Sequence, residues 1–186
     1  MNILLLNAGS SSLKCTLMNS DSDARLAQGS ADWAGSTTRY EYQSAAGAGR
    51  QLEANWSGYG QAVRQFIRDL TETQPVALAD RSELAAVGHR IVHGGDFSEA
   101  VTISPAVRTR IEKLAELAPL HNPPGLETLA AAQQELPHAA HIAVFDTAFH
   151  ATLPPRAFTY AVPHRWTQEW GIRRYGLHGL SPAYRA

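Results

Sequence analysis

Residues 2–18 read NILLLNAGSSSLKCTLM, and this stretch sets the beginning of the fold. Two apolar runs, at 2–6 and 12–18, flank a turn that contains Gly9, which predicts a hairpin of two strands. Three serines and Lys14 follow the glycine, and hydroxyls, backbone N–H groups and an ammonium can together hold phosphate oxygens. Serine-rich turns are also common in hairpins that bind nothing, so both interpretations stay open for this turn by itself.

Short strand-like segments continue after this hairpin. Residues 26–33 and 38–43 are two further candidate strands around a turn at Gly35, so the chain opens as a β-meander. The stretch SAAGAGR at 44–50 indicates an exposed loop. The sequence therefore predicts four consecutive strands before the first helix.

Helical spacing begins beyond this loop. Apolar residues at i, i+3, i+4 and i+7 mark one buried helical face, which predicts a helix packed on the sheet. These residues are Val63, Phe66, Ile67 and Leu70.

A strand, two helices and a second strand follow in chain order. LAAVGHRIVHGG at 84–95 is typical of a strand stopped by glycines, and HIAVFD at 141–146 of a buried strand that ends in an acid. Ser104–Pro105 and Asn122–Pro123 each predict a helix N-cap with proline at the first helical position. Strands first, and then strands alternating with helices, indicate an α/β domain with a mixed sheet.

A break in the pattern comes at HATLPPRAF, residues 150–158, where two prolines interrupt it. We place a domain boundary near Leu153 and predict one domain over 1–152. Residues 153–186 are too few for an independent core, so they are expected to begin an incomplete second domain.

Composition excludes several classes of function. The 186 residues carry a net charge of −1 with no basic block, so we expect no nucleic-acid partner, and 44% are hydrophobic, enough for a sizeable core. The early apolar stretch Ile3–Leu6 is too short for a signal sequence or membrane span. We therefore expect a cytoplasmic protein that binds a small molecule and no membrane. The single cysteine, Cys15, is expected to pack as a small hydrophobe.

Charged side chains and imidazoles recur at the ends of the later strands. Arg90 lies at a strand end, where its guanidinium suits either a bidentate grip on an anion or an ordinary ion pair with an acid. His89 and His93 are about 13 Å apart on a strand, so we do not expect them to share a metal ion. His121 precedes a helix, and Asp146 ends a strand at the place where open α/β sheets hold ligands.

Five stretches, in this order, resemble the acetate kinase family of acyl-phosphate phosphotransferases over essentially the whole chain. They are NAGSSSLK at 7–14, GHRIVHGG at 88–95, LAPLHNP at 117–123, FDTAFH at 145–150 and RRYGLHG at 173–179. The resemblance implies a ribonuclease H-like (actin/hexokinase-type) domain with a mixed β-sheet and packed helices, plus the start of a second domain. It also implies transfer of a phosphoryl group between ATP and a short-chain carboxylate such as acetate, with Mg²⁺ and with acetyl phosphate as product.

The resemblance implies where phosphate and metal would bind. Asn7 belongs to the family's magnesium and phosphate environment. Ser10, Ser12 and Lys14 belong to the turn that faces the phosphate.

Other matching residues are implied to act on the carboxylate and the phosphoryl group. The implied catalytic residues are Arg90, His121, Asp146 and His178. Arg90 grips the acyl substrate, both histidines contact the phosphoryl group, and Asp146 positions the carboxylate nucleophile. The implied walls of the acyl pocket are Val92, Leu120 and Leu177. A carboxylate is ionised near neutral pH, so the reaction needs positioning and charge neutralisation rather than a general base.

The last motif departs from the family. Where the family usually has YGFHGTSH, this chain has YGLHGLSP at 175–182. Leu177 replaces an aromatic wall of the acyl pocket, which leaves acetate and propionate both open as substrates. Leu180 replaces a hydroxyl and Pro182 a histidine, while Ser181–Pro182 still predicts a helix start.

The family's nucleotide-binding half would lie beyond Ala186. The resemblance therefore implies homodimers for the complete enzyme and an inactive or impaired chain by itself. One alternative is a non-catalytic domain that binds acyl phosphate or a partner. Another is a sugar kinase of the same superfamily, which leaves GHRIVHGG and LAPLHNP unexplained.

Overall fold

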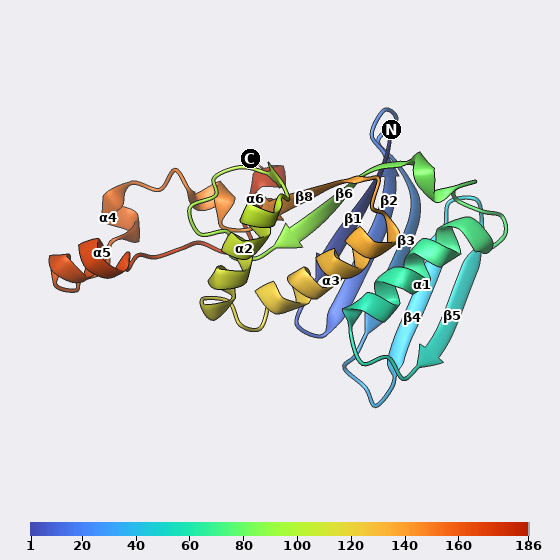
Figure 1. Ribbon diagram of the computed structural model, residues 1–186, viewed down its shortest axis with the longest axis horizontal. Helices are drawn as coiled ribbons and strands as arrows, with labels where there is room; N and C mark the ends of the chain where they lie inside the picture. The colour runs from blue at the N-terminus through green and yellow to red at the C-terminus, as the bar shows by residue number, and fades with distance from the viewer. Residues whose placement is uncertain (186) are drawn as a thin grey trace.

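The computed structural model describes residues 1–185, which form one eight-stranded sheet with helices packed on it (Figure 1). The strand order is β5-β4-β3-β2-β1-β6-β8-β7. The strands are β1 (Asn2–Ala8), β2 (Ser12–Asn19), β3 (Ala24–Asp32), β4 (Thr38–Ser44), β5 (Gly49–Ala54), β6 (Leu84–Ile91), β7 (Val101–Thr102) and β8 (Ala140–Phe145). The helices are α1 (Tyr59–Glu72), α2 (Pro105–Lys113), α3 (Asn122–Glu135), α4 (Pro155–Phe158), α5 (His164–Trp170) and α6 (Leu180–Arg185), with short 3₁₀ turns η1 (Arg81–Glu83), η2 (Leu114–Glu116) and η3 (Ala148–His150).

The sheet is mixed, as the sequence predicts. Strands β1 to β5 pair antiparallel in chain order, which is the predicted meander with one strand more. Strand β1 pairs parallel with β6, and β6 pairs parallel with β8. The carboxyl ends of these three strands therefore meet at one edge of the sheet, and this edge carries the candidate site.

The first helix packs on the sheet through the face that its apolar spacing predicts. Val63, Phe66, Ile67 and Leu70 of α1 are all fully buried. Gly29 of β3 makes room for this helix, because a Cβ there would lie 2.5 Å from the Phe66 ring. Helix α3 packs beside α1 and against β1 and β6 (Figure 1). Cys15 is buried in the same core, as predicted, and burial raises the pKa of its thiol.

The expected loop at 44–50 is only partly a loop. Residue Ser44 ends β4, and its hydroxyl accepts a hydrogen bond from the Ala48 N–H at 3.0 Å, which closes a short turn into β5. Strand β5 reads GRQLEA, in which Leu52 is its one large apolar residue. Its alternation is therefore too weak to predict an edge strand, and only the pairing with β4 reveals it.

A buried carboxylate ties α1 to the meander. Asp69 of α1 is 0% exposed and accepts hydrogen bonds from the Tyr40 hydroxyl at 2.8 Å and the Thr73 hydroxyl at 2.7 Å. Arg50 of β5 places its Nε 2.7 Å from the same carboxylate. Gln65 adds a bond of 3.2 Å from its side-chain amide. This network fixes the helix against β4 and β5.

The last described residues lie outside the sheet. Residues 153–185 contain three short helices and no strand, and Figure 1 shows α4 and α5 standing away from the rest of the fold. Trp170 at the end of α5 is 63% exposed. Helix α6 begins at Leu180, so Ser181 and Pro182, the predicted cap and first helical residue, lie inside its first turn. Among residues 1–185 no helix combines the length and apolar character that crossing a membrane requires.

Two histidines form a buried pair between β6 and β8. His141 Nε2 lies 3.1 Å from the Leu136 carbonyl, so it carries the proton, and His141 Nδ1 then accepts from His89 Nε2 at 3.0 Å. This arrangement leaves His89 Nδ1 unprotonated, buried and without a hydrogen-bond partner in the described residues. Burial, followed by the charge of His141, lowers the pKa of His89 to about 3. Burial, with His138 nearby, also lowers the pKa of His141.

This pair predicts a loss of stability in acid. A base whose pKa is lower in the folded state stabilises the fold above its unfolded pKa, near 6.5, and this stability is lost as the pH falls from there toward 3. We expect the free energy of unfolding to drop by roughly 2 kcal/mol between pH 7 and pH 4.5, measured by urea titration. His89→Gln should flatten this dependence, whereas the same change at exposed His164 should not. Equal pH dependence in both variants would contradict the prediction.

Candidate active site

Three of the predicted site residues meet at the carboxyl ends of the parallel strands. Asn7 lies in β1, Arg90 in β6, and Asp146 directly follows β8. The Arg90 guanidinium holds the Asp146 carboxylate side-on, with Nε 3.1 Å from Oδ1 and Nη2 2.5 Å from Oδ2. Its Nη1 donates to the Asn7 side-chain oxygen at 3.0 Å. Arg90 thus forms an ion pair with an acid, one of the two arrangements that its position at a strand end allows.

The ion pair between Arg90 and Asp146 is largely buried on the side of the acid. The Asp146 side chain is 1% exposed and that of Arg90 23% exposed, while Asn7 is exposed at the same edge. The Asp146 backbone N–H also donates to the Ile91 carbonyl at 3.0 Å, which extends the pairing of β6 and β8 to the acid itself. The guanidinium is therefore held in one orientation at a point that solvent and ligands can reach.

The serine turn lies at the same edge, because it follows β1 directly. It is closed by a hydrogen bond of 2.7 Å from the Gly9 N–H to the Ser12 carbonyl. Ser10 and Ser11 are exposed at its tip. The structure thus places the predicted phosphate turn beside the strand that carries Asn7, and the phosphate role stays a prediction.

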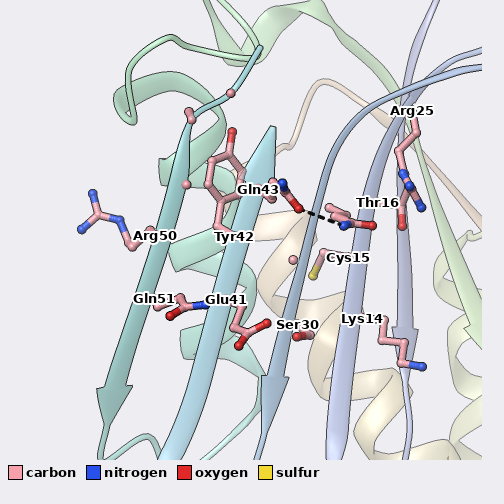
Figure 2. A pocket seen from close by; sticks show the side chains of 15 residues that line it. Lys14, Cys15, Thr16, Arg25, Ser30, Glu41, Tyr42, Gln43, Arg50 and Gln51 are labelled. Atoms are coloured by element: carbon pink, nitrogen blue, oxygen red, sulfur yellow. Dashed lines mark hydrogen bonds between the residues drawn. The ribbon is translucent and has the colours of Figure 1, made fainter. Parts of the chain in front are cut away.

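Lys14 points to the helix-free face of the sheet. It pairs with Asn7 in the β1–β2 register and is exposed, whereas its neighbours Leu13 and Cys15 join the core. Figure 2 shows it at the border of a polar groove of about 850 Å³ that runs over β2 to β5, where Glu41 also lies. Neither Arg90 nor Asp146 lines this groove.

The segment that carries His121 is fastened to the end of β6 by its neighbour. Asn122 is 0% exposed, and its side chain makes two bonds of 3.0 Å to the backbone of His93, accepting from the N–H and donating to the carbonyl. The predicted N-cap at Asn122 is therefore wrong, because the N-cap residue is His121 and its side chain makes no capping bond. The Asn122 side-chain amide therefore does not cap α3. It joins the start of α3 to the segment that follows β6.

The segment that carries His178 is fastened to the end of β8. The Gly179 N–H donates to the Asp146 carbonyl at 3.0 Å, and His150 Nε2 donates to the Leu177 carbonyl at 3.2 Å. A Cβ at Gly179 would lie 2.0 Å from the Asp146 carbonyl oxygen, so only glycine permits this approach. His178 is exposed and has a φ of 59°, in the left-handed region. Contact of either histidine with a phosphoryl group stays a prediction.

The predicted walls of the acyl pocket differ in burial. Val92, just after β6, is 4% exposed, whereas Leu120 is 69% and Leu177 45% exposed on separate segments. The substrate role of these three residues stays a prediction.

Sequence reasoning missed several residues that hold this edge together. The Thr147 hydroxyl accepts from the Gly94 N–H at 3.0 Å, and the Tyr59 hydroxyl donates to the Gly9 carbonyl at 2.6 Å. Tyr175 packs edge-on against the His93 ring, and burial lowers the pKa of His93. Thr147 and Tyr175 lie inside the motifs that carry the family resemblance, whereas nothing in the local pattern around Tyr59 points to a partner fifty residues away.

A metal ion at this edge of the sheet would find few protein ligands among residues 1–185. Within residues 1–185 no three His, Cys, Asp or Glu side chains form a cluster that could enclose an ion. The Asn7 amide oxygen and the Asp146 carboxylate lie together at Arg90. Magnesium often takes only one or two protein oxygens and completes its shell with phosphates and water. The exposed Asn7 oxygen fits that mode, whereas both Asp146 oxygens are already bonded to Arg90.

Comparisons with known proteins agree in sequence and in structure. The model of the acetokinase family matches residues 2–186. The acetate kinase of Helicobacter hepaticus is 39% identical over 99% of this chain and 46% of its own length. That of Deinococcus radiodurans is 43% identical over 98% of this chain and 45% of its own length.

Solved structures give the same result. The acetate kinase of Porphyromonas gingivalis superposes with a TM-score of 0.86 and 37% identity, covering 96% of this chain and 45% of that one. A propionate kinase from Francisella tularensis gives a TM-score of 0.85 and 37% identity, covering 98% of this chain and 46% of that one. The likeness confirms the predicted α/β fold of actin/hexokinase type. The chain spans about half the length of the relatives that it matches.

Proposed function

This chain belongs to the acetokinase family, and from that premise we propose that it supplies the carboxylate- and phosphoryl-contacting half of a phosphotransferase. The reaction moves a phosphoryl group between ATP and a short-chain carboxylate, acetate or propionate. The observation that carries the proposal is the meeting of Asn7, Arg90 and Asp146 beside the serine turn.

Arg90 is suited to bind an anion even though it is already paired. A guanidinium has five N–H donors. Asp146 and Asn7 engage Nε and one hydrogen each of Nη2 and Nη1, so each Nη retains one free N–H. These two donors bind a carboxylate or phosphoryl oxygen, while Asp146 holds the guanidinium plane in place.

The reaction requires two anions, the carboxylate and the phosphoryl group, to be brought together. The carboxylate attacks as an anion, so no residue has to remove a proton from it. Arg90 neutralises charge where the carboxylate meets the phosphoryl group, and His121 and His178 donate to the phosphoryl oxygens as charge develops on them. Mg²⁺ held by Asn7 and the nucleotide phosphates would add further positive charge at the same place, and Asp146 positions the carboxylate nucleophile.

We propose that residues 1–152 form the first of two domains and that 153–186 begin the second. Because the relatives are about twice as long, this chain by itself is expected to be impaired. The complete protein is expected to act in the cytoplasm as a homodimer.

A hydroxamate assay with ATP, Mg²⁺ and acetate or propionate tests the proposal. It is run on the 186-residue chain and on the protein at the length that its reading frame encodes. Turnover that Arg90→Ala lowers by about 10²-fold or more supports the kinase. Binding of acetyl phosphate with no turnover at either length supports the alternative, a non-catalytic binding domain. Turnover with glycerol or a hexose in place of the carboxylate supports a sugar kinase.

A further inference from the structure

We propose that Tyr59, the first residue of α1, is a positioning residue that sets the backbone of the serine turn for phosphoryl binding. The inference rests on the proposed function and assigns a part of the site to a residue outside the family-like motifs.

Tyr59 and Trp33 both contact the serine turn. The Tyr59 hydroxyl donates to the Gly9 carbonyl at 2.6 Å. The Tyr59 ring packs against the Trp33 ring, with centroids 4.7 Å apart. The Trp33 backbone N–H donates to the Ser11 carbonyl at 2.9 Å. The Tyr59 hydroxyl and the Trp33 backbone N–H therefore hold two alternate carbonyls of the turn, those of Gly9 and Ser11.

Holding a carbonyl also orients the neighbouring N–H. The peptide bond between Gly9 and Ser10 is trans, and a trans peptide directs its C=O and its N–H to opposite sides. Because Tyr59 draws the Gly9 carbonyl toward α1, the Ser10 N–H is directed away from the helix. Within residues 1–185 this N–H donates to no other backbone group, and Ser10 is exposed. An outward backbone N–H beside serine hydroxyls is suited to a phosphate oxygen.

Tyr59 is itself well fixed. The N-cap residue Gly58 offers no side chain, and Glu127 of α3 accepts from the Gly60 N–H at 3.1 Å instead. The position of the Tyr59 hydroxyl is thereby linked to α3, the helix whose first turn follows His121. Burial, followed by the charge of Glu127, raises the pKa of Tyr59, so its hydroxyl remains a donor at neutral pH.

The test compares two tyrosines that each lose a bonded hydroxyl. Tyr59→Phe removes the bond to Gly9 and keeps the ring on Trp33. Tyr40→Phe removes a buried hydroxyl that donates to Asp69 at 2.8 Å, on strand β4. Binding of acetyl phosphate and of inorganic phosphate is measured for both variants by NMR titration of the ¹⁵N-labelled chain, together with the urea midpoint.

We expect Tyr59→Phe to weaken phosphate binding three- to tenfold and to shift the Ser10 amide signal in the ligand-free chain. Tyr40→Phe should lower the urea midpoint more and leave phosphate affinity unchanged. Equal affinity of Tyr59→Phe and wild type, or equal weakening by both variants, overturns the inference. If the wild-type chain binds neither probe, the proposed function fails and this inference fails with it. If the wild type and Tyr59→Phe bind both probes equally well, only the inference about Tyr59 fails.

Discussion

Replacing Arg90 by alanine is expected to lower the rate of acyl-phosphate formation by about 10²–10³ and the free energy of unfolding by about 3 kcal/mol. The first effect follows from the role proposed for Arg90, whose donors would neutralise charge in the transition state. The second follows because Asp146, 1% exposed, would keep a buried charge without its partner. The hydroxamate assay and urea denaturation at pH 7 measure the two effects separately.

A double-mutant cycle with Asp146→Ala separates the ion pair from the rest of each side chain. We expect the double variant to be more stable than the sum of the single losses predicts, by more than about 1 kcal/mol, because removing both partners leaves no unpaired charge. Additive losses would show that the pair is not coupled. This measurement of unfolding free energy does not require the chain to be active.

Replacing Asp69 by alanine should cost about 3–4 kcal/mol of stability, measured by chemical denaturation. The substitution leaves the hydroxyl of Tyr40, a residue that is 2% exposed, without its acceptor and removes the partner of Arg50. Asp96→Ala is the matched control, because it breaks an ion pair to Arg110 in which both side chains are more than half exposed. That pair should contribute at most about 1 kcal/mol, and similar losses for both variants would contradict the prediction.

Strong periodicity made much of the fold predictable. The buried face of α1 and the apolar runs of β1, β6 and β8 are long enough that local pattern and tertiary packing agree. Strand β5 is polar and β7 has two residues, so both form only because a neighbouring strand offers hydrogen bonds. Such strands leave no local signal.

The positions of three candidate site residues along the strands could be predicted from the sequence, but their contacts could not. Asn7, Arg90 and Asp146 each stand at a strand end, and the sequence shows that much. Their mutual contact depends on β1, β6 and β8 being parallel neighbours, which only the sheet order reveals. At Asn122 the cap pattern misled, because the same amide that suits a helix start also suits a bond to the backbone of another segment.

The parallel alignment of β1 with β6 has a consequence for insertions and deletions. Successive side chains of a strand point to opposite sides, so moving β6 by one position would send the guanidinium among the helices and bring Ile91 out into water. Extra residues in the connections before or after β6 can be absorbed as longer loops. One extra residue inside β6, ahead of Arg90, would remove the guanidinium from Asp146 and Asn7 while leaving every amino acid of the motif in place.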